Sequence, residues 1–229
     1  MVLVVVGLVA MSFIGTTRTG GPKPGGQGPD NVALAALMNP LSSLPDGFSV
    51  MDRSQLLPPR SPASGPCLSP ADGVATVDWS TSSSYQLRPN GTEAGHLTIS
   101  ATALPSTDIL DRERAYFATP AYRTCLQQEA ADQLAAGFQR GSGATVGSGT
   151  TKPVTDHLPA VGDEFLTKTD YTYVGGTALA TERVVHLYRG RFMVRLTVNY
   201  CSCAPFPDAS VTELAVTELT SRMQALPQA

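Results

Sequence analysis

Three histidines are the side chains of this chain best suited to acid–base chemistry near neutral pH. They are His96, His157 and His186. A hydrolase would need one of them beside a nucleophile and an orienting group, and such partners can be far apart in the sequence. No serine lies in the G-x-S-x-G turn that marks many such nucleophiles. We therefore predict no enzyme and no catalytic residue, and a hydrolase with a cryptic site stays an alternative.

Arginines and tyrosines gather in the last third of the chain and offer a second kind of chemistry. The arginines around one predicted hairpin are Arg183, Arg189, Arg191 and Arg195. Arg191 and Arg195 share one face of a predicted strand, and guanidinium groups bind carboxylates and phosphates well. Tyr171 and Tyr173 lie nearby and could line a lipid or glycan groove. These four are our candidate ligand-binding residues; the alternative is a solvated, ion-paired face with tyrosines that pack the sheet.

The four cysteines are Cys67, Cys125, Cys201 and Cys203. An even number in an exported domain predicts two disulfides. Our preferred pairing joins Cys67 to Cys125 and Cys201 to Cys203; alternatively, Cys201 and Cys203 each reach a distant partner. Structural zinc sites use two paired ligand clusters, which this spacing lacks. We predict no metal and no cofactor.

Composition narrows the range of partners. The chain has 229 residues, of which 15% are charged, and its formal net charge is −3. A nucleic-acid partner would need a clustered Lys/Arg footprint, which is absent from the sequence. With 21 Gly and 18 Pro the chain is rich in loops. We predict one loop-rich domain with a nearly neutral surface and no nucleic-acid partner.

The N-terminus predicts a membrane location. Residues 1–14 are almost wholly apolar, but a membrane-spanning helix needs ~20 residues, and the length suits the apolar region of a signal peptide. Residues 15–30 are rich in Gly and Pro and predict a flexible stalk. We expect an anchor or signal segment, then a stalk, then a domain at 31–229 on the extracytoplasmic side of a cell membrane. The alternatives are an anchor that lacks upstream residues, a poorly formed signal peptide, or a buried core segment.

Hydrophobic periodicity predicts an α+β fold. Alternation predicts strands at 74–80, 85–87, 95–104, 164–173, 178–188 and 191–200, with Trp79 in the core. Helical spacing predicts helices at 31–39, 106–117, 121–140 and 208–226. The residues 141–151 are rich in Gly, Ser and Thr and predict a flexible loop or lid. We expect an antiparallel sheet of about five to six strands, with a long central helix and a C-terminal helix on one face.

These features resemble a group of actinobacterial envelope proteins. The segment LSSLPDGFSV, the positions of Cys67 and Cys125, and the hairpin RVVHLYRGRFMVRLTV before a last helix carry the resemblance. They are similar to the extracellular sensor domains of mycobacterial serine/threonine kinases (the PknH-like group) and to PsbP/Mog1-like lipoproteins. The resemblance implies an extracytoplasmic cleft, two disulfides and an unknown ligand. It implies no catalytic residue.

We therefore predict a membrane-tethered sensing or binding module of the cell envelope, with a small-molecule, lipid or cell-wall ligand. The alternative from another class is a structural envelope protein that acts by protein–protein contact. A binding module should show a concave apolar pocket with a few converging polar groups. A contact protein should show an exposed apolar patch instead.

Overall fold

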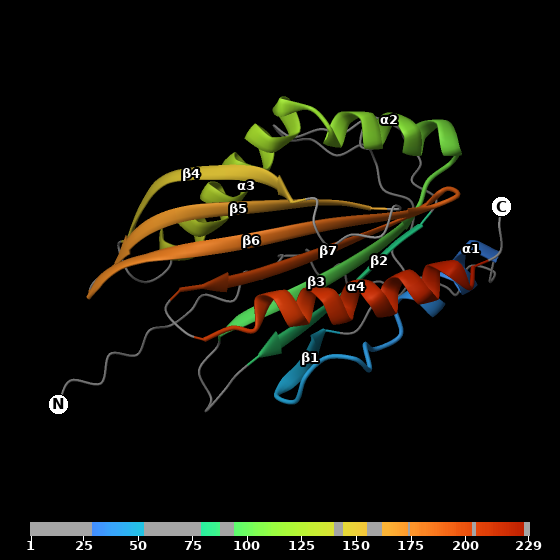
Figure 1. Cartoon of the computed structure of the whole chain (residues 1–229), viewed down its shortest axis with the longest axis horizontal. Helices are drawn as coiled ribbons and strands as arrows, with labels where there is room; N and C mark the ends of the chain where they lie inside the picture. Colours follow the sequence, from blue (N-terminus) through green and yellow to red (C-terminus); the bar gives the residue numbers. More distant parts are fainter. Residues whose placement is uncertain are drawn as a thin grey trace, which may run out of the picture.

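A single antiparallel sheet forms the centre of the molecule. The computed structural model describes residues 29–52, 79–87, 94–139, 144–154, 162–173, 175–202 and 205–226. Its strands are β1 (Phe48–Asp52), β2 (Trp79–Leu87), β3 (Gly95–Ala103), β4 (Thr145–Val154), β5 (Gly162–Tyr173), β6 (Gly176–Arg189) and β7 (Phe192–Cys201). They form one sheet in the order β1-β2-β3-β7-β6-β5-β4, and every neighbouring pair is antiparallel (Figure 1). With its helices, this sheet confirms the α+β class.

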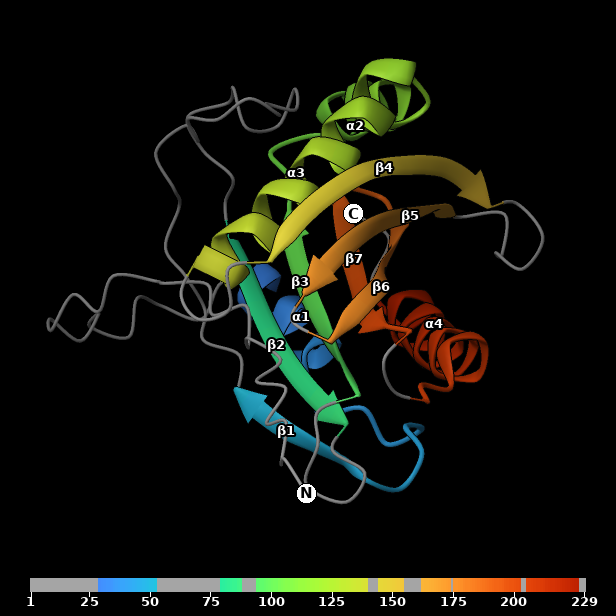
Figure 2. The same ribbon diagram turned by 90° about the vertical axis from the view of Figure 1, so that its left-hand side faces the viewer.

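Helices cover both faces of the sheet. The helices are α1 (Pro29–Leu37), α2 (Thr107–Phe117), α3 (Pro120–Gln139) and α4 (Asp208–Gln224). Helices α1 and α4 pack on one side, which we call the α4 face, and α2 and α3 on the other, the α3 face (Figures 1 and 2). The expectation that the helices share one face is wrong. Strand β6 shows why: Val185 contributes to the core under α4, whereas its neighbour Val184 contributes to the core under α3.

The core on the α4 face follows directly from strand alternation. In β3 every second residue is buried, from Leu97 through Ile99 to Ala103. Their partners on β7 include Val198 and Leu196, which are also buried. Burying a leucine or isoleucine side chain contributes about 1.5–3 kcal/mol. This apolar layer holds α4 flat against the sheet.

The helix α3 lies toward one edge of the sheet rather than over its centre. It packs against the strands β4 and β5. Its buried residues Tyr122 and Leu126 join Phe117 of α2 and Phe165 of β5 in a separate core cluster. The helical spacing thus predicted both ends of α3 within one residue. The helix is long, but it does not lie at the centre of the sheet.

Three regions differ from the strand prediction, and the described part of the sheet has seven strands instead of five to six. Strand β1 was not predicted. The residues 145–151, expected as part of a loop, belong to β4 at the outer edge of the sheet. An edge strand needs only one hydrogen-bonded neighbour and buries little, so its composition can be that of a loop. Its pairing with β5 shifts register between Val146 and Gly149. In β2, one strand replaces two short predicted ones.

Some predictions fall outside the described residues. These are the apolar segment 1–14, most of the stalk, the start of the predicted strand 74–80, and the side-chain position of Trp79. Within the described ranges, no helix combines the length and the apolar character needed to cross a bilayer.

Candidate ligand-binding groove

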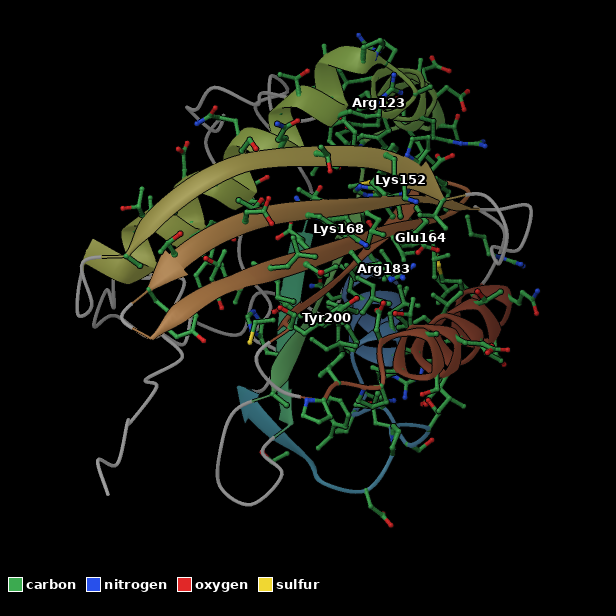
Figure 3. The ribbon with its side chains drawn as sticks, turned by 60° about the vertical axis from the view of Figure 1, so that its left-hand side comes forward. Arg123, Lys152, Glu164, Lys168, Arg183 and Tyr200 are labelled. Carbon is green, nitrogen blue, oxygen red and sulfur yellow. The ribbon has the colours of Figure 1, made fainter. Side chains whose placement is uncertain are left out.

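A groove lies on the α4 face, between the first turns of α4 and the strands β4, β5 and β6. Its volume is about 300 Å³. Its lining residues are Lys152, Val154, Glu164, Leu166, Arg183, Ala209, Thr212, Glu213 and Val216. Figure 3 shows that the labelled side chains Lys152, Glu164 and Arg183 come from three successive strands beside α4.

Strand register brings the floor of the groove together. Lys152 pairs with Leu166 across β4 and β5, and Leu166 pairs with Arg183 across β5 and β6. Val154 pairs with Glu164 one step along the same ladder. Directly opposite residues on neighbouring strands point to the same face of a sheet. The groove floor is therefore a row of apolar and charged side chains, and α4 supplies one wall.

Arg183 is held at the floor by two carboxylates. Its Nε donates to Asp208 Oδ1 at 3.0 Å, its Nη2 donates to Asp208 Oδ2 at 2.8 Å, and its Nη1 pairs with Glu164. The hydroxyl of Tyr200 donates to the same Asp208 at 2.7 Å. Burial alone would lower the pKa of Arg183, but hydrogen bonds and attraction to Asp208 and Glu164 raise it. A guanidinium has five N–H donors, so donors remain for a ligand.

Two lysines give the groove a cationic rim. Lys152 and Lys168 are exposed on the same face, since Lys168 pairs with Thr150, two residues from Lys152 (Figure 3). Neither forms an ion pair with any residue that the structure describes. Glu164 is buried and shares Arg183 with Asp208, so this cluster of one guanidinium and two carboxylates adds no positive charge to the groove. The positive charge that an approaching anion meets is that of Lys152 and Lys168.

Charged and apolar side chains make up most of the groove, and none of the described residues that line it is a histidine or a cysteine. Its one hydroxyl, on Thr212, donates to Asp208 Oδ1 at 3.5 Å, and that carboxylate is already held by Arg183 and Tyr200. Apolar side chains from Val154, Leu166 and Val216 provide the remaining surface. Such a surface can hold a small molecule with one charged end and one apolar end.

The four candidate ligand residues from the sequence do not come together. Arg191 forms an ion pair with Asp30 and donates to the carbonyl of Leu104 at 2.8 Å, so it fastens α1 to the sheet. Arg195 lies on the α3 face, opposite the groove. Tyr171 is buried, with its ring centroid 5.8 Å from that of Tyr173.

Those tyrosines pack with Cys201 away from the groove. Their role in binding stays a prediction. The groove could not be predicted from the sequence, because its residues come together only through the register of three strands. Arg183 belonged to the arginine cluster, but its carboxylate partners Glu164 and Asp208 are distant in the sequence.

The described histidines are structural. His186 is fully buried, its Nε2 lies 2.7 Å from the hydroxyl of Tyr122, and its ring stacks on Phe117 with centroids 4.1 Å apart. Burial, with the nearby positive charge of Arg195, lowers the pKa of His186 well below its usual value. His96 lies half-buried beside Asn199. His157 falls outside the described residues.

Both cysteines that the structure describes are oxidised to disulfides. Cys125 on α3 and Cys201 at the end of β7 are both disulfide-bonded, and no described cysteine is free. Cys67 and Cys203 lie in segments that the structure leaves undescribed, so the preferred pairing stays a prediction. Among the described residues, no group of three or more His, Cys, Asp or Glu side chains could hold a metal ion.

Comparison with solved structures gives distant matches, and two of them are as follows. No family model and no curated protein matches the chain. The chain is similar to the extracellular domain of PknH from Mycobacterium tuberculosis, with 10% identity over 88% of this chain and 100% of that one and a TM-score of 0.43. It is also similar to a putative uncharacterized protein from Mycobacterium smegmatis, the Rv0999 ortholog, with 14% identity, 84% and 96% coverage and a TM-score of 0.38.

The first of these structures is the extracellular domain of PknH, the kind of protein named in the expected resemblance, and both proteins are mycobacterial. With TM-scores below 0.5, neither match carries an argument about this chain. Neither match is described as a PsbP/Mog1-like protein, and that part of the resemblance stays an expectation. A likeness this distant carries no information about a ligand, so the function has to be argued from the groove itself.

Proposed function

We propose that the chain is an extracytoplasmic binding or sensing module of the cell envelope, and that its ligand occupies the groove beside α4. The observation that carries the proposal is the groove's composition: a floor of apolar and charged side chains, an arginine held in place by two carboxylates, and two rim lysines that form no ion pair with the described residues. Its volume of about 300 Å³ suits a small ligand.

The ligand that fits best is a small amphipathic anion. Its carboxylate or phosphate would approach Lys152 and Lys168, and its apolar part would cover Val154, Leu166 and Val216. Hydrogen bonds from the remaining N–H groups of Arg183 would orient the polar end. Glu213 on the groove wall would disfavour a ligand with negative charge at both ends.

The location is proposed from the sequence. Residues 1–14 would supply the apolar membrane segment and residues 15–28 the stalk, since Pro29 and Asp30, expected in the stalk, belong to α1. Disulfides persist in oxidising compartments, and both described cysteines are disulfide-bonded. A tethered domain with an open groove would sample ligands at the membrane surface.

A contact protein is less well supported. Among the described residues only two large apolar side chains are exposed, Val32 at 59% and Leu214 at 38%. A docking surface would need a contiguous apolar patch of a few hundred Å². We propose no enzymatic activity, because the carboxylate beside the groove's one hydroxyl, Asp208, is held by Arg183 and Tyr200.

The test is thermal unfolding of the full chain with three eight-carbon probes: octanoate, octyl phosphate and octyltrimethylammonium. A ligand that binds only the folded state raises the unfolding midpoint. We expect the two anions to raise it and the cation to leave it unchanged. Lys152→Ala should abolish the shift. The control is Arg123→Ala, which removes a cation from α3, on the other face of the sheet (Figure 3).

Two results would contradict the proposal. If neither anion raises the midpoint, the groove does not select amphipathic anions. If the shift is the same in Lys152→Ala as in the wild type, the anions bind elsewhere on the protein.

A further inference from the structure

A buried carboxyl group on the α3 face lacks the partners that such a group needs. Glu182 of β6 is 5% exposed, and its Oε1 has no hydrogen-bond partner. Its cross-strand neighbours are Asn199 on β7 and Thr167 on β5, which are uncharged. A buried carboxylate with an oxygen that accepts no hydrogen bond is costly, and a proton reduces that cost.

The charges that act on Glu182 come from three neighbouring elements. Arg195 of β7 and His96 of β3 favour its ionised form, and Glu129 of α3 opposes it. Arg195 also forms the ion pair with Glu129, at 3.7 Å between Nη2 and Oε2. The Nε of Arg195 is buried without an acceptor. Arg195 thus pairs with Glu129 of α3, and its positive charge also acts on Glu182 of the sheet.

The protonation state of Glu182 changes the charge that faces the ion pair between Arg195 and Glu129. When Glu182 is ionised, it attracts Arg195 and repels Glu129. When Glu182 is neutral, both effects disappear and the pair of Arg195 with Glu129 is undisturbed. We propose that Glu182 is a proton-binding site of this protein, and that the proton it takes up ties α3 more firmly to the sheet through Arg195 and Glu129.

The electrostatics support this assignment. Burial, the largest cause, raises the pKa of Glu182 from 4.5 to about 7; Arg195 and His96 lower it, and Glu129 raises it. The folded protein therefore holds this proton at pH values where the unfolded chain has released it. For a group with a raised pKa, stability is fully present below pH 4.5 and is lost as the pH rises through 7.

His186 acts in the opposite direction and must be separated from Glu182. Its pKa is lowered, so its contribution to stability is lost as the pH falls below its usual 6.5. The wild-type pH profile contains both effects. The difference between wild type and Glu182→Gln, which cannot take up this proton, isolates Glu182.

The experiment compares the full chain with Glu182→Gln and Glu129→Gln by urea unfolding at pH 5 and pH 8. From pH 5 to pH 8, we expect the folding equilibrium constant of the wild type to fall roughly fiftyfold relative to that of Glu182→Gln. Hydrogen exchange of the α3 amides gives a second readout. Their protection should be roughly three- to fivefold higher at pH 5 than at pH 8 in the wild type, as expected for a half-exposed ion pair.

In Glu182→Gln the high protection of α3 should persist at both pH values, and in Glu129→Gln it should be low at both. The site is overturned if Glu182→Gln keeps the wild-type pH profile of stability. The coupling to α3 is overturned if α3 protection changes with pH in Glu129→Gln as it does in the wild type. Neither outcome bears on the α4 groove, which lies on the opposite face.

Discussion

Glu218 of α4 anchors the segment that follows α1. Its carboxylate accepts hydrogen bonds from the backbone N–H of Ser42 at 3.0 Å and of Ser43 at 2.9 Å, and it pairs with Arg222. Arg222 in turn donates to the carbonyls of Leu37 at 3.0 Å and of Pro40 at 2.8 Å. Two side chains one helical turn apart thus satisfy the backbone groups where α1 ends.

Removal of the Glu218 charge should destabilise the protein. Glu218→Gln weakens hydrogen bonds to a charged acceptor, and we expect a loss of about 1–3 kcal/mol at pH 7. Burial raises the pKa of Glu218, but the bonds from Ser43 and Ser42 and the charge of Arg222 outweigh it and lower the pKa to about 2. The contribution is therefore present above pH 4.5 and lost as the pH falls through 2.

Urea unfolding at pH 7 and pH 3 measures this effect, with Glu213→Gln as the control because Glu213 is exposed on the same helix. Equal stability of the two variants at pH 7 would show that Glu218 anchors nothing.

For single residues, the sequence predicts which side chains are present near a site better than it predicts which side chains they contact. The arginine cluster was visible, and Arg183 does lie in the groove. Its pairing with Glu164 and Asp208 depends on strand register and on where α4 begins, which periodicity does not set. The burial of Glu182 could not be predicted from the sequence, because a charged residue in a strand of alternating polarity is expected on the exposed face.

Elements with one clear apolar face were predictable. The alternation in β3 and β7 and the spacing in α3 gave bounds within one or two residues of the structure. Strand β4 was missed because both of its faces are largely exposed. The face of the sheet on which each helix packs could not be predicted either, since it depends on β6 having apolar residues on both of its faces.

The start of α4 depends on a close contact with β3. A Cβ on Gly95 would lie 2.5 Å from Cε2 of Phe206 and 2.8 Å from the carbonyl oxygen of Asn199. Phe206 stacks on Tyr200 with ring centroids 5.0 Å apart, just before α4 begins. Gly95→Ala should therefore cost about 1–3 kcal/mol, as overpacking does.

Thermal unfolding checks this prediction, and Gly147→Ala serves as the control. A Cβ at Gly147 would keep 3.2 Å from the nearest atom, the carbonyl oxygen of Asp170. If Gly95→Ala is no less stable than Gly147→Ala, the approach of Phe206 to β3 does not matter for folding.

At the scale of the whole molecule, both described cysteines are disulfide-bonded, and they lie in elements far apart in the sequence. Cys125 lies on α3, and Cys201 lies at the end of β7. Each native disulfide contributes about 2–5 kcal/mol. A reductant should therefore lower the unfolding midpoint of the full chain, by roughly 2–4 °C per kcal/mol for a domain of this size.

Peptide mapping without reduction should find Cys125 joined to Cys67 and Cys201 joined to Cys203. If the reductant leaves the unfolding midpoint unchanged, the disulfides do not stabilise the protein. If the peptide map shows other pairs of cysteines, the predicted pairing is wrong.

The edge strand β4 is built in a way that discourages sheets of neighbouring molecules from joining. Strand β4 presents its free side to solvent, yet Pro153 has no N–H to donate, Lys152 adds an exposed charge, and the register shift near Gly149 bends the strand. These are the features by which natural sheets avoid joining edge to edge. Many copies of this domain could therefore be concentrated on one surface, or expressed at high yield, without fusing into fibres through β4.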